Sequence, residues 1–330
     1  MPRILHSRIA QVLFVAGVII LAVQGLNTKP QPVSPFEMQT EHIAVLSPHM
    51  HGQGDSAEDS THHVTVNSQV EIAPRDMYIS KIKFEMVNAP NVVLHHASFV
   101  DLSQPNQTCP NFPHWRELFV YGSDRMYDNA LTFPKGYALF IKKGTPLKLQ
   151  LMVHNPEPPL GPGETYKDVY TRIVLTESSE PARSLSLLEP YLLHLDDKSC
   201  GFTEPDASDV YTFAVPAHTR RYVFKGHGSD DQSSTKVFSK PATIVHLAGH
   251  LHGWQGAKQL VIYKNGQAMH TFDIIPSTTS PFIYETRHTA APYHMNAGDK
   301  LSISALYEND HAVSARGVMG IVGFYYVDDH

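Results

Sequence analysis

The sequence predicts an all-β protein built as two β-sandwiches in series, and three observations support this. The composition, 42% hydrophobic and 18% charged, is typical of an ordered globular chain. Twenty-four Pro and twenty Gly, among many Val, Thr, Tyr and Phe residues, favour short strands joined by turns. No long segment has the apolar period of a helix. Because 330 residues exceed what one hydrophobic core usually serves, we expect one large or two medium domains.

The first 26 residues predict a membrane-targeting segment. Arg3 and Arg8 precede the uncharged, almost wholly apolar run Ile9–Leu26. This run is about long enough to cross a bilayer, and no clear small-residue cleavage site follows it before Asn27. We expect a signal anchor at residues 1–26, with a cleaved signal peptide as the alternative. Either one places the body outside the cytoplasm, in the periplasm, the extracellular space or a secretory lumen.

Residues 27–63 predict a flexible tether between membrane and body. The segment is rich in Pro, Ser, Gln, Asp and His and poor in large apolar residues. It contains His49-Met-His51 and His62-His63, which could capture a metal transiently, although a plain polar linker is the simpler interpretation.

Charge and cysteine content narrow the environment and the partners. A net charge of −6 gives no reason to expect nucleic acid or an anionic membrane surface as a partner. The two cysteines, Cys109 and Cys200, agree with an oxidising compartment in which one structural disulfide can persist. The sequence leaves their pairing open.

The folded body is predicted to begin near Val64 and to divide at a hinge, giving domains at 64–179 and 184–330. Alternating or β-rich runs bounded by Gly and Pro mark the expected strands. In the first domain these are 64–72, 78–84, 91–100, 118–122, 137–142, 146–155 and 168–175. In the second they include 210–215, 221–225, 243–247, 259–263, 300–307 and 320–327.

A pair of histidines between two of these strands predicts a metal site. In extended chain, His250 and His252 project from the same face and can hold one ion together. The strand after them ends in Asn265-Gly266, a hairpin dipeptide. Neutral imidazole suits copper, zinc, iron or nickel, so this pair alone does not choose the metal. The alternative is a pair of surface histidines on a turn.

Three further histidines lie in the first predicted domain. Adjacent residues such as His95 and His96 face opposite sides of a regular strand, so they can share one metal only at a bulge or a strand end. Without such an irregularity, one would lie in the core and the other in water. His154 follows an alternating strand, at its C-terminal end.

The order of these motifs resembles the copper type II ascorbate-dependent monooxygenases, the family of the peptidylglycine α-hydroxylating and dopamine β-monooxygenases. The similar features are the histidine pair, the Leu-x-Val-His strand, His-x-His before Asn-Gly, and a late Met before Tyr-Tyr. The match spans roughly residues 64–328. The run Gly317-Val-Met-Gly320 also resembles the stress-upregulated Nod19 proteins.

The resemblance implies two jelly-roll β-sandwich domains with two copper ions on the surfaces that face the cleft between them. His95, His96 and His154 would surround an electron-storing copper. His250, His252 and Met319 would surround the catalytic copper, which binds and activates oxygen.

Met319 is the residue that discriminates between metals. A thioether favours Cu(I), whereas zinc would seldom recruit one, and a hydrolytic zinc site would need a nearby acidic base. The alternative is an ordinary apolar residue at the start of a core strand.

Two positions depart from the family. Where the peptide hydroxylase binds its substrate carboxylate with an Arg, this chain has Ala248, and Gly323 replaces an aromatic residue. Without the guanidinium, a peptide C-terminus has no bidentate partner here, which argues against peptide amidation.

We therefore expect a copper-dependent monooxygenase that hydroxylates a substrate C–H bond with O₂ and an external reductant, such as ascorbate or a quinol-like molecule. The substrate would be a small or lipid-like molecule. Two alternatives stay open: a membrane-anchored copper carrier or sensor without catalysis, and a structural or adhesion module without metal.

Overall fold

The computed structural model describes residues 34–46, 63–90, 93–106, 115–122, 130–154, 165–195, 213–225, 234–251, 256–273, 275–276, 284–285, 289–312, 314–318 and 320–329. The chain divides into two compact units, Met1–Pro35 and Phe36–His330, and the fold below is that of the second. The predicted anchor and both cysteines lie outside the described residues. Within those residues, no helix has the length and apolar character needed to span a membrane.

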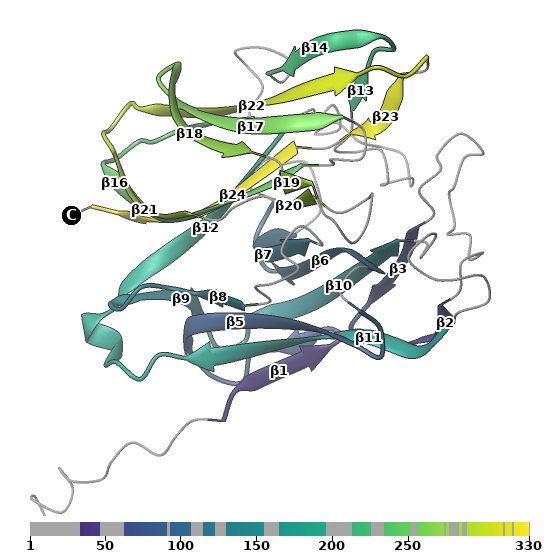
Figure 1. Ribbon diagram of the computed structural model, residues 1–330. Coiled ribbons are helices and arrows are strands. Elements are labelled where there is room, and N and C mark those ends of the chain that lie inside the picture. Colours follow the sequence, from purple (N-terminus) through teal and green to yellow (C-terminus); the bar gives the residue numbers. More distant parts are fainter. Residues whose placement is uncertain are drawn as a thin grey trace, which may run out of the picture. The chain divides into compact units, whose positions relative to one another are not determined.

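The all-β prediction is confirmed, since strands and short 3₁₀ turns such as Ala182–Ser184 make up the regular structure (Figure 1). The strands are β1 (Phe36–Gln39), β2 (Ile43–Leu46), β3 (His63–Asn67), β4 (Glu71–Ile72), β5 (Met77–Val87), β6 (Leu94–Asp101), β7 (Arg116–Gly122), β8 (Ala130–Thr132), β9 (Tyr137–Ile141), β10 (Pro146–His154), β11 (Tyr166–Glu177), β12 (Ser186–His194), β13 (Phe213–Val215), β14 (Thr219–Phe224), β15 (Thr235–Val237), β16 (Ala242–Leu251), β17 (Ala257–Lys264), β18 (Gln267–Asp273), β19 (Ile275–Pro276), β20 (Tyr284–Glu285), β21 (Thr289–Met295), β22 (Lys300–Asn309), β23 (Ala315–Val318) and β24 (Gly320–Asp328).

The first half of the compact unit packs two groups of strands around one hydrophobic cluster. One group follows the order β1-β11-β5-β9, with β2 and β8 at its side, and the other follows β3-β10-β6-β7, with β4 on β10. Alternation explains the packing: in β10, Leu147, Leu149, Leu151 and Val153 are all buried. Side chains from both groups, including Phe84 and Phe99, form this cluster.

The second half repeats this design with its own cluster. The strands β12-β24-β16-β21 and the sheet β14-β22-β17-β18, with β15 on β22, contribute Leu247, Leu260, Ile303 and Phe324 to it. The strand β12, which the sequence analysis missed, pairs in parallel with β9 and antiparallel with β24. One ten-stranded sheet therefore runs through both halves.

The folded body begins earlier than predicted. Both β1 and β2 lie inside the segment expected to be a tether, yet they pair with β11. Their apolar side chains Met38, Ile43 and Leu46 are buried in the first cluster, which corrects the tether prediction for these strands. The cause is a short apolar pattern whose burial outweighs the polar composition around it.

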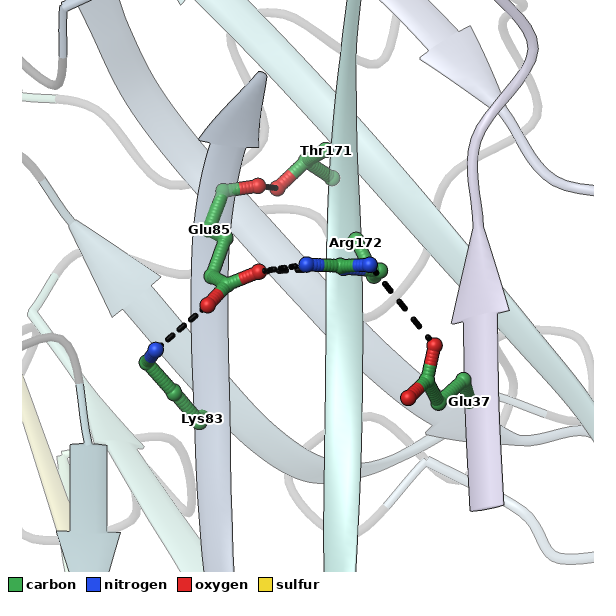
Figure 2. Close-up of polar contacts among 5 residues, drawn as sticks. All are labelled: Glu37, Lys83, Glu85, Thr171 and Arg172. Atoms are coloured by element: carbon green, nitrogen blue, oxygen red, sulfur yellow. Dashed lines mark hydrogen bonds and ion pairs between the residues drawn. The ribbon is translucent and has the colours of Figure 1, made fainter. Parts of the chain in front are cut away.

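Charged side chains tie β1, β11 and β5 together on one face of the sheet (Figure 2). Glu85 accepts hydrogen bonds from Lys83 and from Arg172, whose Nε lies 3.0 Å from Oε2. Arg172 also reaches Glu37 on β1, with Nη1 3.8 Å from Oε2. These bonds, first those from Lys83 and then those from Arg172, lower the pKa of Glu85. The half-exposed face of the sheet is thus held by paired charges.

The predicted hairpin is confirmed. Asn265 and Gly266 have φ values of 52° and 80° and join β17 to β18 directly, as a primed two-residue turn requires. Asp299 fixes the turn, since its carboxylate accepts hydrogen bonds from Asn265 Nδ2 (2.6 Å) and Lys264 Nζ (2.8 Å). The bonds from Lys264, the Asn296 backbone and Asn265 lower the pKa of Asp299 to about 2.

Candidate metal centre

The adjacent histidines of the first half lie at an irregularity in β6. Met152 of β10 pairs with His96, but the next residue, Val153, pairs with Leu94, so His95 is the extra residue of a β-bulge. A bulge interrupts the alternation of side chains, which is the condition under which neighbouring histidines can serve one site. His154 follows Val153 directly and ends β10 opposite His63 of β3. All three predicted ligands of this half therefore lie at one end of two paired strands.

The second half brings its predicted ligands to the end of another strand pair. The strand β16 continues through His250 to Leu251, further than the sequence suggested. Its register with β24 pairs His250 with Ile321 and Leu251 with Gly320. Leu251 and Gly320 are the chain neighbours of His252 and Met319, which both lie outside the described residues.

His96 and His250 meet across the two halves. Their Nε2 atoms lie 2.8 Å apart, with the ring centroids 4.5 Å apart and the ring planes at 71°. Both side chains are half-buried. The resemblance assigns one of them to each of two separate ligand sets. Within the described part of the chain, no three His, Cys, Asp or Glu side chains form a group that could hold a metal.

A third histidine, missed by the sequence analysis, lies behind this pair. His194 of β12 and His250 of β16 are both paired with Ile321 of β24, so the three side chains share one face of the sheet. His194 is 2% exposed, and burial, followed by the charge of His250, lowers its pKa to about 3. Its Nε2 lies 3.9 Å from Glu117 Oε2. His194 is therefore a neutral imidazole at neutral pH.

The signal for His194 was present but weak. It ends a run that begins at Ser186 and contains Leu188, Pro190 and Leu192 at alternate positions, all of them buried. A proline inside a run argues against a central strand, because it cannot donate to the ladder. Alternation alone could have recovered β12, but not the proximity of its last residue to His250.

A small cavity of about 30 Å³ lies between β7, β8, β12, β16 and β24. Most of its lining is apolar, and Glu117 is the charged residue found among the described lining residues. Ala248 and Gly323 face each other in the β16–β24 register and both contribute to the wall. The two departures from the monooxygenase pattern thus lie together, and no described guanidinium takes their place in this wall.

The structure describes the six predicted ligands to different extents. His96 and His250 are in contact. His95 and His154 are placed by their backbones at adjoining strand positions, and their side chains lie outside the description. His252 and Met319 lie outside the described residues, so their positions in a site stay predictions.

Comparisons with known proteins assign the chain to no family. No family model and no curated protein matches it. Among solved structures, it is similar to PNGF-II (10% identity, TM-score 0.36), covering 90% of this chain and 65% of that one. It is also similar to the major capsid protein of Bacteriophage PM2 (7% identity, 89% and 98% covered, TM-score 0.34). For the PBCV-1 virus capsid, identity is 9%, coverage is 92% and 96%, and the TM-score is 0.33. The chain thus spans just under two thirds of the length of PNGF-II.

Proposed function

We propose that this chain is a copper-dependent monooxygenase whose metal ligands come from both halves of the compact unit. One observation carries the proposal: strand ends far apart in sequence converge where His96 Nε2 and His250 Nε2 lie 2.8 Å apart. The bulge at His95 and the end of β10 at His154 adjoin the first of these histidines. Unrelated surface histidines would have no reason to converge in this way.

The donors at this point suit copper. Two half-buried imidazole nitrogens face each other, with a third, neutral imidazole at His194 behind them. Nitrogen ligands of this kind serve copper, and the thioether of Met319 would favour Cu(I) over zinc. Copper, when bound by His95, His96, His154, His250, His252 and Met319, supplies the one-electron chemistry needed to activate O₂. The resemblance divides these six ligands between two ions.

The proposal includes a finer architecture than the all-β class. The two hydrophobic clusters support two jelly-roll sandwiches, with the anchor at residues 1–26 holding the body outside the cytoplasm. In that arrangement the centre lies where β6 of one sandwich meets β16 of the other.

The cavity wall that contains Ala248 and Gly323 indicates which class of substrate fits. A small, mainly apolar cavity whose described charged residue is Glu117 disfavours a substrate carboxylate, because two anions would face each other. We therefore propose an uncharged small or lipid-like substrate, with ascorbate or a quinol-like molecule as the external reductant.

Metal analysis combined with oxygen uptake tests the proposal on the full-length chain. We expect bound copper, up to two ions per chain, and O₂ consumption that requires both copper and ascorbate. The zinc-loaded chain serves as the control and should consume no O₂. Failure to bind copper, or copper binding without any O₂ consumption, would reject the monooxygenase.

A copper carrier or sensor is the second candidate, and the Ala248 and Gly323 wall favours it, since a carrier needs no group that orients a substrate. A carrier would retain copper yet consume no O₂ with ascorbate. The same experiment therefore separates the two functions.

A further inference from the structure

We propose that His96 and His250 bind the first metal ion jointly, so that the two predicted ligand sets meet in one shared centre. The inference rests on the proposed function only for the identity of the metal, copper. It goes further in naming the two nitrogens that hold the ion. The carrying observation is the 2.8 Å distance between the Nε2 atoms of two residues that the resemblance assigns to different ions.

Two facing imidazole nitrogens at this distance can be stabilised in two ways. One ring can donate its N–H to the lone pair of the other, or both lone pairs can face one cation. Two protonated rings are excluded, because each would present a proton and a positive charge to the other. Either arrangement requires at least one neutral ring, and the metal requires both to be neutral at Nε2.

The distance also discriminates between coordination geometries. For metal–nitrogen bonds of about 2.0 Å, nitrogens 2.8 Å apart subtend an angle of about 90° at the ion. A tetrahedral ion would need about 3.3 Å between the same atoms. An angle near 90° is that of tetragonal sites, which Cu(II) and Ni(II) prefer and zinc does not. The spacing of the pair is thus compatible with a tetragonal Cu(II) site.

Both histidines stand on strands that are paired with neighbouring strands. His96 of β6 is paired with Met152 of β10 and Gly122 of β7. His250 of β16 is paired with Ile321 of β24, whereas the pairing of β16 with β21 extends only to Leu247.

Nearby contacts also tie the two halves together. Tyr325 Oη donates to the Leu118 carbonyl at 2.9 Å, and the Tyr325 ring packs on Phe133 with centroids 4.8 Å apart. Moving the two backbone segments that carry the imidazoles apart would require movement of whole sheets. The backbone positions of the pair are thus preorganised, which lowers the entropic cost of binding an ion.

Shared and separate ligation predict different consequences of removing one histidine. If two independent ions were bound, the His96→Ala variant would lose one ion and keep the other at full affinity. If the first ion is shared, either substitution removes the same tight binding event. A second substitution then weakens the binding of the first ion little further, so the effects of the two substitutions on affinity are not additive.

The test titrates Cu(II) into the full-length wild type, His96→Ala, His250→Ala and the double variant, by calorimetry and by electron paramagnetic resonance at one equivalent. We expect each single variant to bind the first ion at least about tenfold more weakly, and the double variant to differ from either by less than about threefold. A wild-type spectrum of tetragonal Cu(II) with nitrogen ligands should disappear equally in both single variants. Full-affinity binding of one ion by each single variant would overturn the proposal.

His311→Ala is the matched control, since this histidine is 75% exposed and lies away from the centre in sequence and in pairing. It should leave the first ion unchanged and so report adventitious binding by surface histidines. If an alanine variant loses its far-ultraviolet circular dichroism, His96→Gln and His250→Gln repeat the test, because an amide keeps a polar side chain of similar size.

Oxygen uptake takes no part in this readout. A chain that fails to consume O₂ can still show the shared ion, and an active chain can still show two independent ions.

Discussion

Two polar clusters in this molecule differ in the charge of their side chains, since one holds an ionised carboxylate and the other a neutral imidazole. On the β1-β11-β5 face, Glu85 is flanked by Lys83 and Arg172, and these partners keep its carboxylate ionised. At the centre between the halves, His194 and its neighbours are imidazoles, and burial keeps His194 neutral. Paired charges at a surface fasten strands, and the partners of Glu85 already bind both of its carboxylate oxygens. A neutral imidazole instead carries a nitrogen lone pair of the kind that binds metals.

The largest expected effect on stability comes from removing the buried imidazole of His194. His194→Ala should lower the free energy of unfolding of the metal-free chain by about 2–3 kcal/mol, because a fully enclosed ring leaves a cavity. Urea denaturation measures this. His194→Leu is the control: it fills similar volume and should cost less than about 1.5 kcal/mol. Equal stability of the Ala variant and the wild type would show that the ring is not packed as described.

A smaller effect on stability is expected from breaking the charged pairs of Arg172 on the β1-β11-β5 face. Arg172→Ala removes a partner from both Glu85 and Glu37, yet the Arg172 side chain is 41% exposed and solvent screens these pairs. We expect a loss of about 0.5–1 kcal/mol in urea denaturation, which should shrink in 1 M salt. Arg220→Ala, on the exposed surface of β14, controls for loss of charge alone. A loss as large as that of His194→Ala would contradict the comparison.

The smallest effect is the pH dependence contributed by Glu85. Its folded pKa lies below the ordinary value of 4.5, so the unfolded chain takes up the proton first as the pH falls. The stabilisation is complete above pH 4.5 and is lost as the pH drops through the folded pKa. Comparing wild type with Glu85→Gln by thermal unfolding should show a difference at pH 6 that vanishes near pH 2. If the stability difference between wild type and Glu85→Gln grew as the pH fell, the folded pKa of Glu85 would lie above its ordinary value, contrary to this prediction.

The sequence predicted those elements whose local pattern carries the information. The alternation of apolar and polar residues located β10, and the dipeptide Asn265-Gly266 located the hairpin between β17 and β18. Both signals depend only on residues that are neighbours in the chain. It missed β12, where Pro190 obscures the pattern, and it missed β1, where four residues are too few for a period to be evident.

The candidate site was predictable as residue types and not as an arrangement. Spacing singled out His250 as a candidate ligand, the family resemblance added His96, and the bulge that a shared site at the histidine pair requires is present at His95. The contact between His96 and His250 depends on how two sheets pack across 154 residues of chain, which no local pattern encodes. The proximity of His194 depends on its register with Ile321, for the same reason.

The position of β12 has a consequence for how the protein folds. This strand follows the 3₁₀ turn between the halves, pairs with β9 before it and receives β24 from the end of the chain. The second half cannot join β12 to β16 until β24 arrives, so closing the sheet carries the entropic cost of a long loop. Folding of the two halves is therefore coupled, and a nascent chain that lacks its last strand exposes an open sheet edge at β12.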